Sequence, residues 1–286
     1  MPNILDLRRR IRSVKNTQQI TRAMKMVAAA RLRRAQEQVL GARPYARQMV
    51  SLLESLSART SYRSHPLLVE RPVRRVLLVL VTADRGLCGA FNANLIRAAH
   101  KYLMENRTKE ILLIAAGRKG RDFFRRQSIK MSAEYVNIFS RRVEFYHAHE
   151  LAKKIIDLYM SEAVDAVDFV YNEFKSILTQ HLVVERRLPV RPATPAVTET
   201  PVDYIYEQPP EEIFSRLLPR YVEAEVYRAL LESQAAEFAS KMTAMDAATR
   251  NAGDLIDQYT LNLNRVRQAK ITTEIIEIVS GAAAAS

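Results

Sequence analysis

Hydrophobic side chains recur every three or four residues along the first 57 positions of the chain. The recurrence begins at Ile4, Leu7 and Ile11 and continues past Leu32 to Val39, while proline occurs only at positions 2 and 44. This spacing aligns apolar side chains on one face of an α-helix. The pattern predicts a long N-terminal helix over residues 1–57.

The same spacing returns at the far end of the chain. Residues 221–280 contain no proline and a single glycine, and an unbroken helix of that length would extend about 90 Å. Steps of four and three residues separate the apolar or small positions Phe238, Met242, Met245, Thr249, Ala252, Ile256, Tyr259, Leu263 and Val266. This is the spacing of a coiled coil, and it predicts a C-terminal helix within residues 211–286.

Each of these two helices carries one narrow apolar stripe, which is shielded from water only if another helix packs against it. We therefore expect the two helices to pack against each other as an antiparallel hairpin. Beyond Val266 the same positions are occupied by Lys270, Thr273 and Glu277, so the pairing should loosen while the helix continues. The last two turns are predicted to project alone.

Between the two helices, short apolar runs alternate with segments of helical length. Those segments lie near 91–105, 118–127 and 148–162, and the apolar runs are VLLVLV (76–81), ILLIAA (111–116), YVNIF (135–139), VDFVY (167–171) and LVVE (182–185). Continuous apolar runs are typical of strands buried on both faces. The alternation predicts an α/β domain over residues 75–187, inserted in the hairpin. Residues 188–210 hold six of the eleven prolines and are predicted to form an extended connection.

Positive charge is concentrated in the N-terminal helix. The chain of 286 residues has a formal net charge of +13, and residues 1–36 hold ten arginines or lysines against one acid, Asp6. Such a patch indicates a partner that presents phosphate, anionic lipid or an acidic protein surface. No apolar run reaches the roughly 18 residues of a membrane-spanning helix, and the single cysteine, Cys88, cannot form an internal disulfide. We therefore expect a soluble or peripheral protein of a reducing compartment.

Two motifs invite a ligand-binding interpretation. TADRGLCGAFN (82–92) follows the first strand, where a doubly wound domain places a ligand loop, but it lacks the glycine and lysine pattern of phosphate loops. We favour a plain strand-to-helix turn. His147 and His149, beside Glu150, have no third ligand nearby, so a helix cap is favoured over a metal site. Nothing in the sequence indicates catalytic residues, a bound cofactor or a metal.

Four regions of the chain resemble the gamma subunit of the rotary ATP synthase. They are RIRSVKNTQQITRAMKMVAAARLRRAQ (10–36), TADRGLCGAFN (82–92), DYIYEQPP (203–210), and SKMTAMDAATRNAGDLI with RQAKITTEIIEIVSGAAA (within 240–284). The resemblance implies a non-catalytic central rotor shaft, which couples proton-driven rotation of a ring of c subunits to conformational change at the catalytic beta subunits. It also implies a Rossmann-like fold for the α/β domain and no cofactor.

The resemblance further implies partners and contact residues. The partners are an alpha3-beta3 hexamer, the epsilon subunit and the c-ring, which is the only link to the membrane. The residues expected to contact beta are Met24, Lys25, Arg31, Arg33, Arg34, Arg85, Cys88, Arg267, Gln268 and Thr272. The tip in its apolar bearing comprises Ile275, Ile276, Ile278, Val279 and Ala285, and the c-ring contact comprises Tyr204, Tyr206 and Glu207.

A few positions depart from the usual residues of the family. Lys25 stands where many members have glutamate, Ala90 replaces a frequent glycine, and Asp246 with Arg250 alters the charges of the C-terminal signature. These departures put local ion pairs in question rather than the assignment. No cysteine pair or long insertion follows the central turn, which disfavours the chloroplast type.

The Arg-rich, acid-poor start of the chain has the composition of an organellar presequence. Its apolar spacing runs from Ile4 past residue 30 without a cleavage region. We therefore interpret it as mature structure and expect a bacterial protein, peripheral on the cytoplasmic side of the inner membrane. Two alternatives stand beside the rotor: a basic helical hairpin that binds nucleic acid, and an enzyme that uses the α/β domain. Because the basic residues lack interleaved aromatic side chains, we expect no nucleic acid partner.

Overall fold

A computed structural model describes residues 3–57, 65–127, 129–140, 142–190 and 210–284. The chain divides into two compact units. Met1–Ala28 with Met242–Ser286 forms the shaft unit, and Ala29–Lys241 forms the α/β unit.

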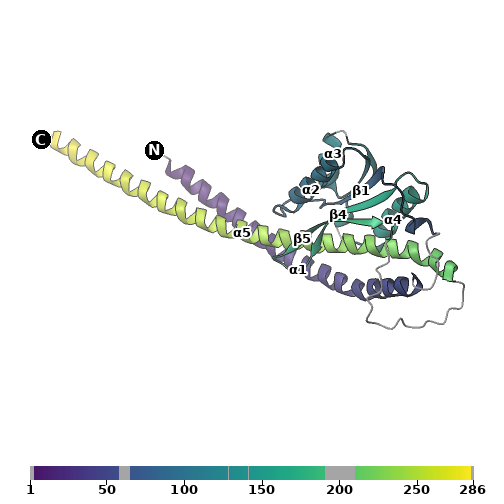
Figure 1. Cartoon of the computed structure of the whole chain (residues 1–286). Helices are drawn as coiled ribbons and strands as arrows, with labels where there is room; N and C mark the ends of the chain where they lie inside the picture. The colour runs from purple at the N-terminus through teal and green to yellow at the C-terminus, as the bar shows by residue number, and fades with distance from the viewer. Residues whose placement is uncertain (1–2, 58–64, 128, 141, 191–209, 285–286) are drawn as a thin grey trace. The chain divides into compact units, whose positions relative to one another are not determined.

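Both long helices predicted from the sequence are present, and each contributes residues to both units (Figure 1). Helix α1 spans Ile4–Ser57 and helix α5 spans Pro210–Ala284. Pro44 and Pro219 lie inside these helices and do not end them. None of the helices that the structure describes combines the length and the apolar character needed to cross a membrane.

The shaft unit is an antiparallel pair of helices. On α1, Leu7, Thr21 and Ala28 are buried, and on α5 the predicted seam coincides with the least exposed positions. Met245 and Ala252 are buried, while Ile256, Tyr259, Leu263 and Val266 are half-buried. Residues 267–280 are all exposed, although the helix continues. The predicted hairpin and the predicted unpaired end of α5 are therefore both confirmed.

The α/β unit is built on one five-stranded sheet with the strand order β3-β2-β1-β4-β5. The four strands β1 to β4 are parallel and β5 is antiparallel to β4. The strands are β1 (Arg75–Val81), β2 (Glu110–Ala116), β3 (Met131–Tyr135), β4 (Ala166–Phe174) and β5 (Gln180–Leu188). The shorter helices are α2 (Phe91–Glu105), α3 (Arg118–Arg126) and α4 (Phe145–Met160), with 3-10 turns at Pro66–Leu68 and Ile138–Ser140.

Helices cover both faces of this sheet, as Figure 1 shows for α2 and α3 on one side and α4 and α5 on the other. Tyr102 of α2 donates a hydrogen bond to Asp168 on one face of β4. On the opposite face, Phe169 of β4 shares a small space with Ile155 of α4 and Val226 of α5. Strand β1 lies between β2 and β4 in the sheet and has helices on both of its faces, so residues 76–81 are fully buried. The predicted Rossmann-like α/β insertion is confirmed.

Two of the predicted strands differ from the structure. The run YVNIF was predicted as a strand, but β3 ends at Tyr135, because Asn137 has a positive φ of 65° and a 3-10 turn follows. The run LVVE does lie in β5, yet β5 is an antiparallel edge strand with Leu182 and Val184 exposed. The expectation that this strand is buried on both faces is therefore wrong.

Candidate functional site

The contacts inside the shaft unit fix the antiparallel register of its two helices. The hydroxyl groups of Thr21 and Thr249 are hydrogen-bonded at 2.8 Å, and the Gln18 side-chain amide donates to the Thr249 carbonyl oxygen at 3.4 Å. Gly253 lies opposite Gln18, whose amide nitrogen would be 3.2 Å from a Cβ at that position. Small residues thus bring the two backbones close together along this stretch.

The two unusual charges of the shaft pair with each other. Lys25 on α1 forms an ion pair with Asp246 on α5, and Asp246 also lies 3.4 Å from Arg250. The hydrogen bond from Lys25 holds the pKa of the Asp246 carboxyl below its usual range. The two departures from the family pattern therefore compensate one another. The Lys25 ammonium group is not free for a partner in this arrangement.

This pairing predicts the outcome of a charge-reversal cycle. Lys25→Glu and Asp246→Lys should each lower the melting temperature of the chain slightly, because each places like charges opposite one another. The double variant should recover most of the loss. A thermal melt at low salt, repeated at high salt, measures the coupling. Additive losses in the double variant would show that the pair contributes nothing to the shaft.

Three further basic residues predicted to contact beta, Arg31, Arg33 and Arg34, lie on α1 within the α/β unit and are exposed. The Arg31 guanidinium lies 6.0 Å from the ring centre of Phe238, and Arg33 lies 3.4 Å from the Glu37 carboxylate. Arg34 has no carboxylate within ion-pair distance in the part of the chain that the structure describes. Their alternation with the buried Leu32 and Ala35 confirms that one face of this helix is packed and the other is presented to solvent.

The turn after β1 is organised by the buried side chain of Asp84. Its carboxylate accepts hydrogen bonds from the backbone N–H groups of Arg118 (3.0 Å), Asn137 (2.8 Å) and Phe139 (2.9 Å). Asp84 thereby ties the turn to the start of α3 and to the segment after β3. The amide N–H of Gly120 is also taken, by the Thr82 hydroxyl at 2.9 Å.

These bonds bear on nucleotide binding at the turn. A helix N-terminus binds phosphate through free backbone N–H groups. At α2, which the turn leads into, the N–H of Phe91 donates to the carbonyl oxygen of Cys88 at 3.2 Å. The neighbouring first turn of α3 donates to Asp84, Thr82 and the carbonyl oxygen of Ala83. At Gly117 an added Cβ would lie 2.0 Å from the carbonyl oxygen of Thr82. The turn is packed against its neighbours, which favours the interpretation of a structural strand-to-helix turn.

The turn places its two predicted contact residues differently. Arg85 is exposed, whereas Cys88 is only 2% exposed. Burial raises the pKa of the Cys88 thiol, and the nearby Glu237 raises it further. Cys88 therefore has almost no surface to offer a partner. The residues that the turn presents to solvent are Arg85, Leu87, Gly89 and Ala90.

The crevice where a doubly wound fold usually binds its ligand is occupied by helix α5. The strand order changes direction between β1 and β4, which makes the carboxyl ends of those strands the expected ligand position. There Glu232 of α5 accepts a hydrogen bond from the backbone N–H of Phe174, the last residue of β4, at 3.0 Å. Residues 229–239 of α5 are all buried. The crevice thus anchors a helix of the same chain.

Two carboxylates of this α5 segment, Glu232 and Glu237, are buried, and the sequence analysis did not predict their burial. Burial raises the pKa of both Glu232 and Glu237. Glu237 pairs with Lys241 at 2.7 Å through one oxygen, while its other oxygen has no hydrogen-bond partner among the described residues. A periodic pattern assigns such glutamates to a solvated face. The available signal was that this stretch is rich in alanine and has no single apolar stripe.

The raised pKa of Glu232 predicts a pH dependence of stability. Because the folded pKa lies above the ordinary 4.5, the wild-type chain loses stability as pH rises from that value through the folded pKa. Glu232→Gln keeps an oxygen to accept from Phe174. Arg43, which lies 3.6 Å from the Glu232 carboxylate, is 42% exposed and therefore stays hydrated when that negative charge is removed. The variant should therefore be more stable than wild type at pH 8, with a difference that shrinks toward pH 4. Urea unfolding at both pH values measures this, with Glu105→Gln on the exposed side of α2 as control.

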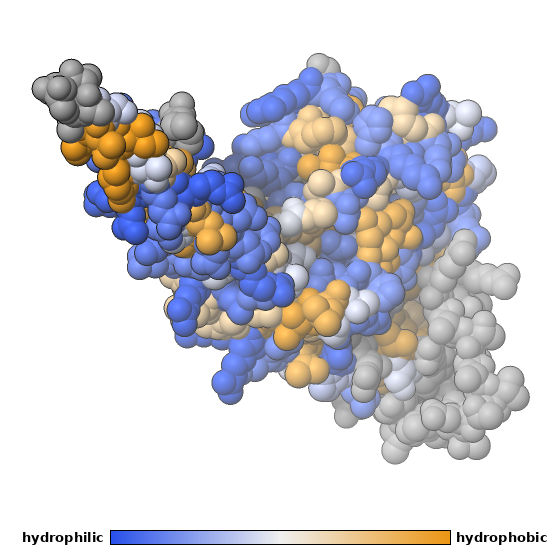
Figure 2. Space-filling view, turned by 90° about the vertical axis from the view of Figure 1, so that its left-hand side faces the viewer, coloured by the Kyte–Doolittle hydropathy of each residue, from blue (hydrophilic) through white to orange (hydrophobic). Residues whose placement is uncertain are grey.

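The last turns of α5 present an apolar surface within the shaft unit. The predicted tip residues Ile275, Ile276, Ile278 and Val279 are each more than half exposed. Figure 2 shows hydrophobic surface gathered next to the terminal residues drawn in grey. Arg267, Gln268 and Thr272, which precede the tip in α5 and are predicted to contact beta, are exposed as well.

Several predicted site residues lie outside the described part of the chain. These are the tip residue Ala285 and the c-ring contact Tyr204, Tyr206 and Glu207. Among described residues, no group of three or more potential ligands could hold a metal ion. His147 instead forms a capping box with Glu144 at the start of α4, and His149 lies 3.0 Å from Glu223. The predicted helix cap is confirmed for His147.

Comparison with known proteins gives one consistent result. Residues 3–285 match the family model described as ATP synthase. The chain is 50% identical to the ATP synthase gamma chain of Solibacter usitatus, with full coverage of both chains, and 50% identical to that of Desulfitobacterium hafniense, with 99% coverage of both.

Solved structures agree with this result. The chain resembles one from the central stalk and c-ring of the Tetrahymena thermophila mitochondrial ATP synthase at 26% identity and a TM-score of 0.61, covering 80% of this chain and 99% of that one. A chain of the Euglena gracilis mitochondrial ATP synthase rotor shares the fold at 21% identity, with a TM-score of 0.65 and coverage of 94% and 98%.

Proposed function

We propose that this chain transmits torque as the central shaft of a rotor. The proposal starts from its family, because the chain belongs to the gamma chains of the ATP synthases. In this role it is the non-catalytic stalk subunit of the complex. It couples rotation of a c-ring to conformational change at the catalytic beta subunits, for ATP synthesis or hydrolysis. The similarity to gamma chains and stalk structures does not support the alternative of a nucleic-acid-binding hairpin.

The observation that carries this proposal is the continuity of α5. The helix runs for 75 residues without a break, and its buried segment is anchored to the end of β4 through Glu232. Sharp helix kinks arise at proline, at Gly/Ser pairs or at inserted groups, and residues 221–280 hold no proline and only Gly253. A continuous helix anchored in a folded domain resists bending, and stiffness is what transmission of torque requires.

The coupling rests on asymmetry rather than on side-chain chemistry. A single shaft inside a ring with three-fold symmetry presents a different surface to each of three catalytic sites. Each rotational position then favours one set of beta conformations by differential contact free energy. We assign the contacts with beta to Met24, Arg31, Arg33, Arg34, Arg85, Arg267, Gln268 and Thr272, the bearing to residues 275–285, and the c-ring contact to Tyr204, Tyr206 and Glu207. Lys25, which pairs with Asp246, supports the surface around Met24 from within the shaft.

The partners follow from the same assignment. They are the alpha3-beta3 hexamer around α1 and α5, the epsilon subunit, and the c-ring, which is the route to the membrane. The ten basic residues of the first 36 match an acidic protein surface that moves past them. We place the complex on the cytoplasmic side of a bacterial inner membrane.

Reconstitution tests the function directly. Complexes with and without this chain are placed in vesicles, and ATP hydrolysis is measured beside ATP-driven proton uptake. With the chain present, the two activities should be linked. Without it, the hexamer should hydrolyse ATP but pump no protons. Full rotation-coupled transport in its absence would refute the proposal.

A further inference from the structure

A cavity of about 870 Å³ lies within the α/β unit, between α1, α5 and the segment around Ser140 and Arg142. Small residues on α1, Ala35, Gly41 and Ala42, leave the space open. A Cβ added at Gly41 would meet no atom within 4 Å. Pockets for small molecules occupy roughly 300–1,000 Å³, so the cavity has the size of a ligand site.

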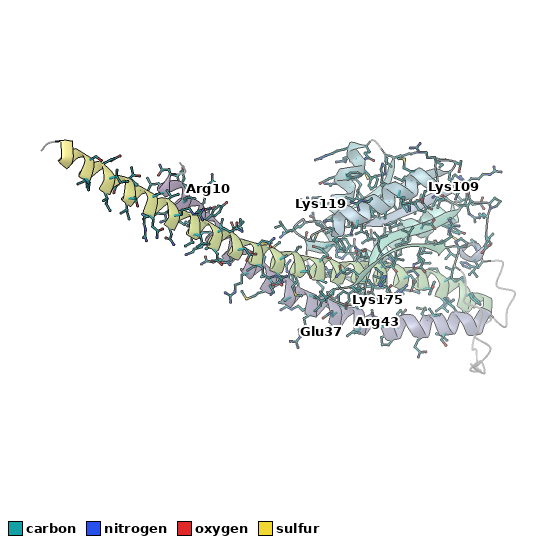
Figure 3. The ribbon with its side chains drawn as sticks, turned by 60° about the vertical axis from the view of Figure 1, so that its left-hand side comes forward. Arg10, Glu37, Arg43, Lys109, Lys119 and Lys175 are labelled. Carbon is teal, nitrogen blue, oxygen red and sulfur yellow. The ribbon has the colours of Figure 1, made fainter. Side chains whose placement is uncertain are left out.

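The cavity carries an excess of positive charge, although Arg31 also interacts electrostatically with the buried Glu237. Arg31, Arg34 and Arg142 line it, and each is exposed. Within the described residues none of the three has a carboxylate at ion-pair distance. The one acid in the lining, Glu37, is already 3.4 Å from Arg33 (Figure 3 labels Glu37 on α1). Three guanidinium groups around one space match a phosphate-bearing ligand, because each can donate two parallel hydrogen bonds to phosphate oxygens.

Two aromatic side chains of α5 also line the cavity, and one of them is held in place. Tyr227 and Phe238 of α5 both line the cavity. The Tyr227 ring is fixed edge-on against Phe145 at 5.5 Å between ring centres. The Gln38 side-chain amide donates to the Val143 carbonyl oxygen at 3.3 Å and ties α1 to the rim. A preformed aromatic wall suits a planar ring.

We propose that this cavity binds a phosphate-bearing small molecule of nucleotide size. Its phosphates lie against Arg31, Arg34 and Arg142, and its ring lies against Tyr227. The site is separate from the crevice at the carboxyl ends of β1 and β4, which α5 fills. It adds a ligand to a chain whose role as a shaft requires none.

Binding of ATP to the full-length purified chain, measured by calorimetry without magnesium, tests the proposal. ATP should bind once per chain. Arg142→Ala should weaken binding about tenfold, the loss of one charge-assisted phosphate contact. Gly41→Leu should abolish binding by filling the cavity. It should not harm the fold, because leucine is the better helix former and a Cβ at this position meets no atom within 4 Å. Arg97→Ala, which removes an exposed arginine of α2, is the matched control and should change nothing.

Competition with parts of ATP shows whether the phosphates or the adenine ring contribute most of the binding affinity. Pyrophosphate should displace ATP, and adenosine alone should not, because the guanidinium groups dominate. ATP binding that survives in Gly41→Leu, or no saturable binding at millimolar ATP, would overturn the proposal. It would also be overturned if an acidic peptide bound in an Arg142-dependent way while ATP did not, since the groove would then be a protein interface.

Discussion

Proline in place of Ile256 is expected to uncouple ATP hydrolysis from proton pumping. Ile256 lies half-buried on the seam of the shaft unit, one turn from the buried Ala252. Proline removes the backbone hydrogen bond to the Ala252 carbonyl and its ring clashes with that group, which costs about 3 kcal/mol and kinks the helix. The ratio of protons pumped to ATP hydrolysed, measured in vesicles, should fall several-fold.

A matched substitution separates stiffness from packing. Ile256→Ala removes the same side chain from the seam but leaves the helix continuous. It should therefore lower the melting temperature of the chain while keeping most of the coupling. Both variants are compared on complexes that purify with the full set of subunits, so that failed assembly is seen separately. A proline variant that assembles and couples normally would contradict the stiff-shaft argument.

The parts of the fold that the sequence predicts are those fixed by local pattern. The seam from Phe238 to Val266 repeats at helical spacing, and each of its positions proved to be buried or half-buried. The strands β1 and β2 were recognisable because a run of six apolar residues is unambiguous at the centre of a sheet. The predicted strand at 135–139 failed at Asn137, which has a positive φ and donates its backbone N–H to the carboxylate of Asp84, 53 positions earlier, instead of to a neighbouring strand.

The parts that could not be predicted depend on residues far apart in the chain. Glu232 reads as a surface residue of a long helix, yet it accepts a hydrogen bond from Phe174, which lies 58 positions earlier. Likewise, the pairing of Lys25 with Asp246 joins positions 221 residues apart. The exposure of the basic side chains on α1 could be predicted from their charge and helical spacing alone. The burial of Cys88 could not, because its surroundings include residues far along the chain, such as Glu237 and Lys241 of α5, whose charges act on its thiol.

Alanine in place of Asp84 is expected to destabilise the α/β unit more than any other single change at the turn. The substitution leaves the backbone N–H groups of Arg118, Asn137 and Phe139 without their acceptor. Stranded donors at a buried site cost about 1–3 kcal/mol each when water cannot reach them, and partial relaxation makes roughly 3–5 kcal/mol a realistic total. Hydrogen exchange followed by mass spectrometry should show faster exchange in β2 and in residues 137–140.

The location of the effect distinguishes this prediction from general unfolding. Because Asp84 contacts only the α/β unit in the bonds described, amides of α5 beyond residue 245 should keep their protection. Asp122→Ala is the control, since that carboxylate is 42% exposed and pairs with its neighbour Arg121; its loss should cost less than about 1 kcal/mol. Asp84→Asn, which retains one oxygen, should fall between the two. Equal unfolding midpoints for Asp84→Ala and Asp122→Ala would show that the turn is not organised by this carboxylate.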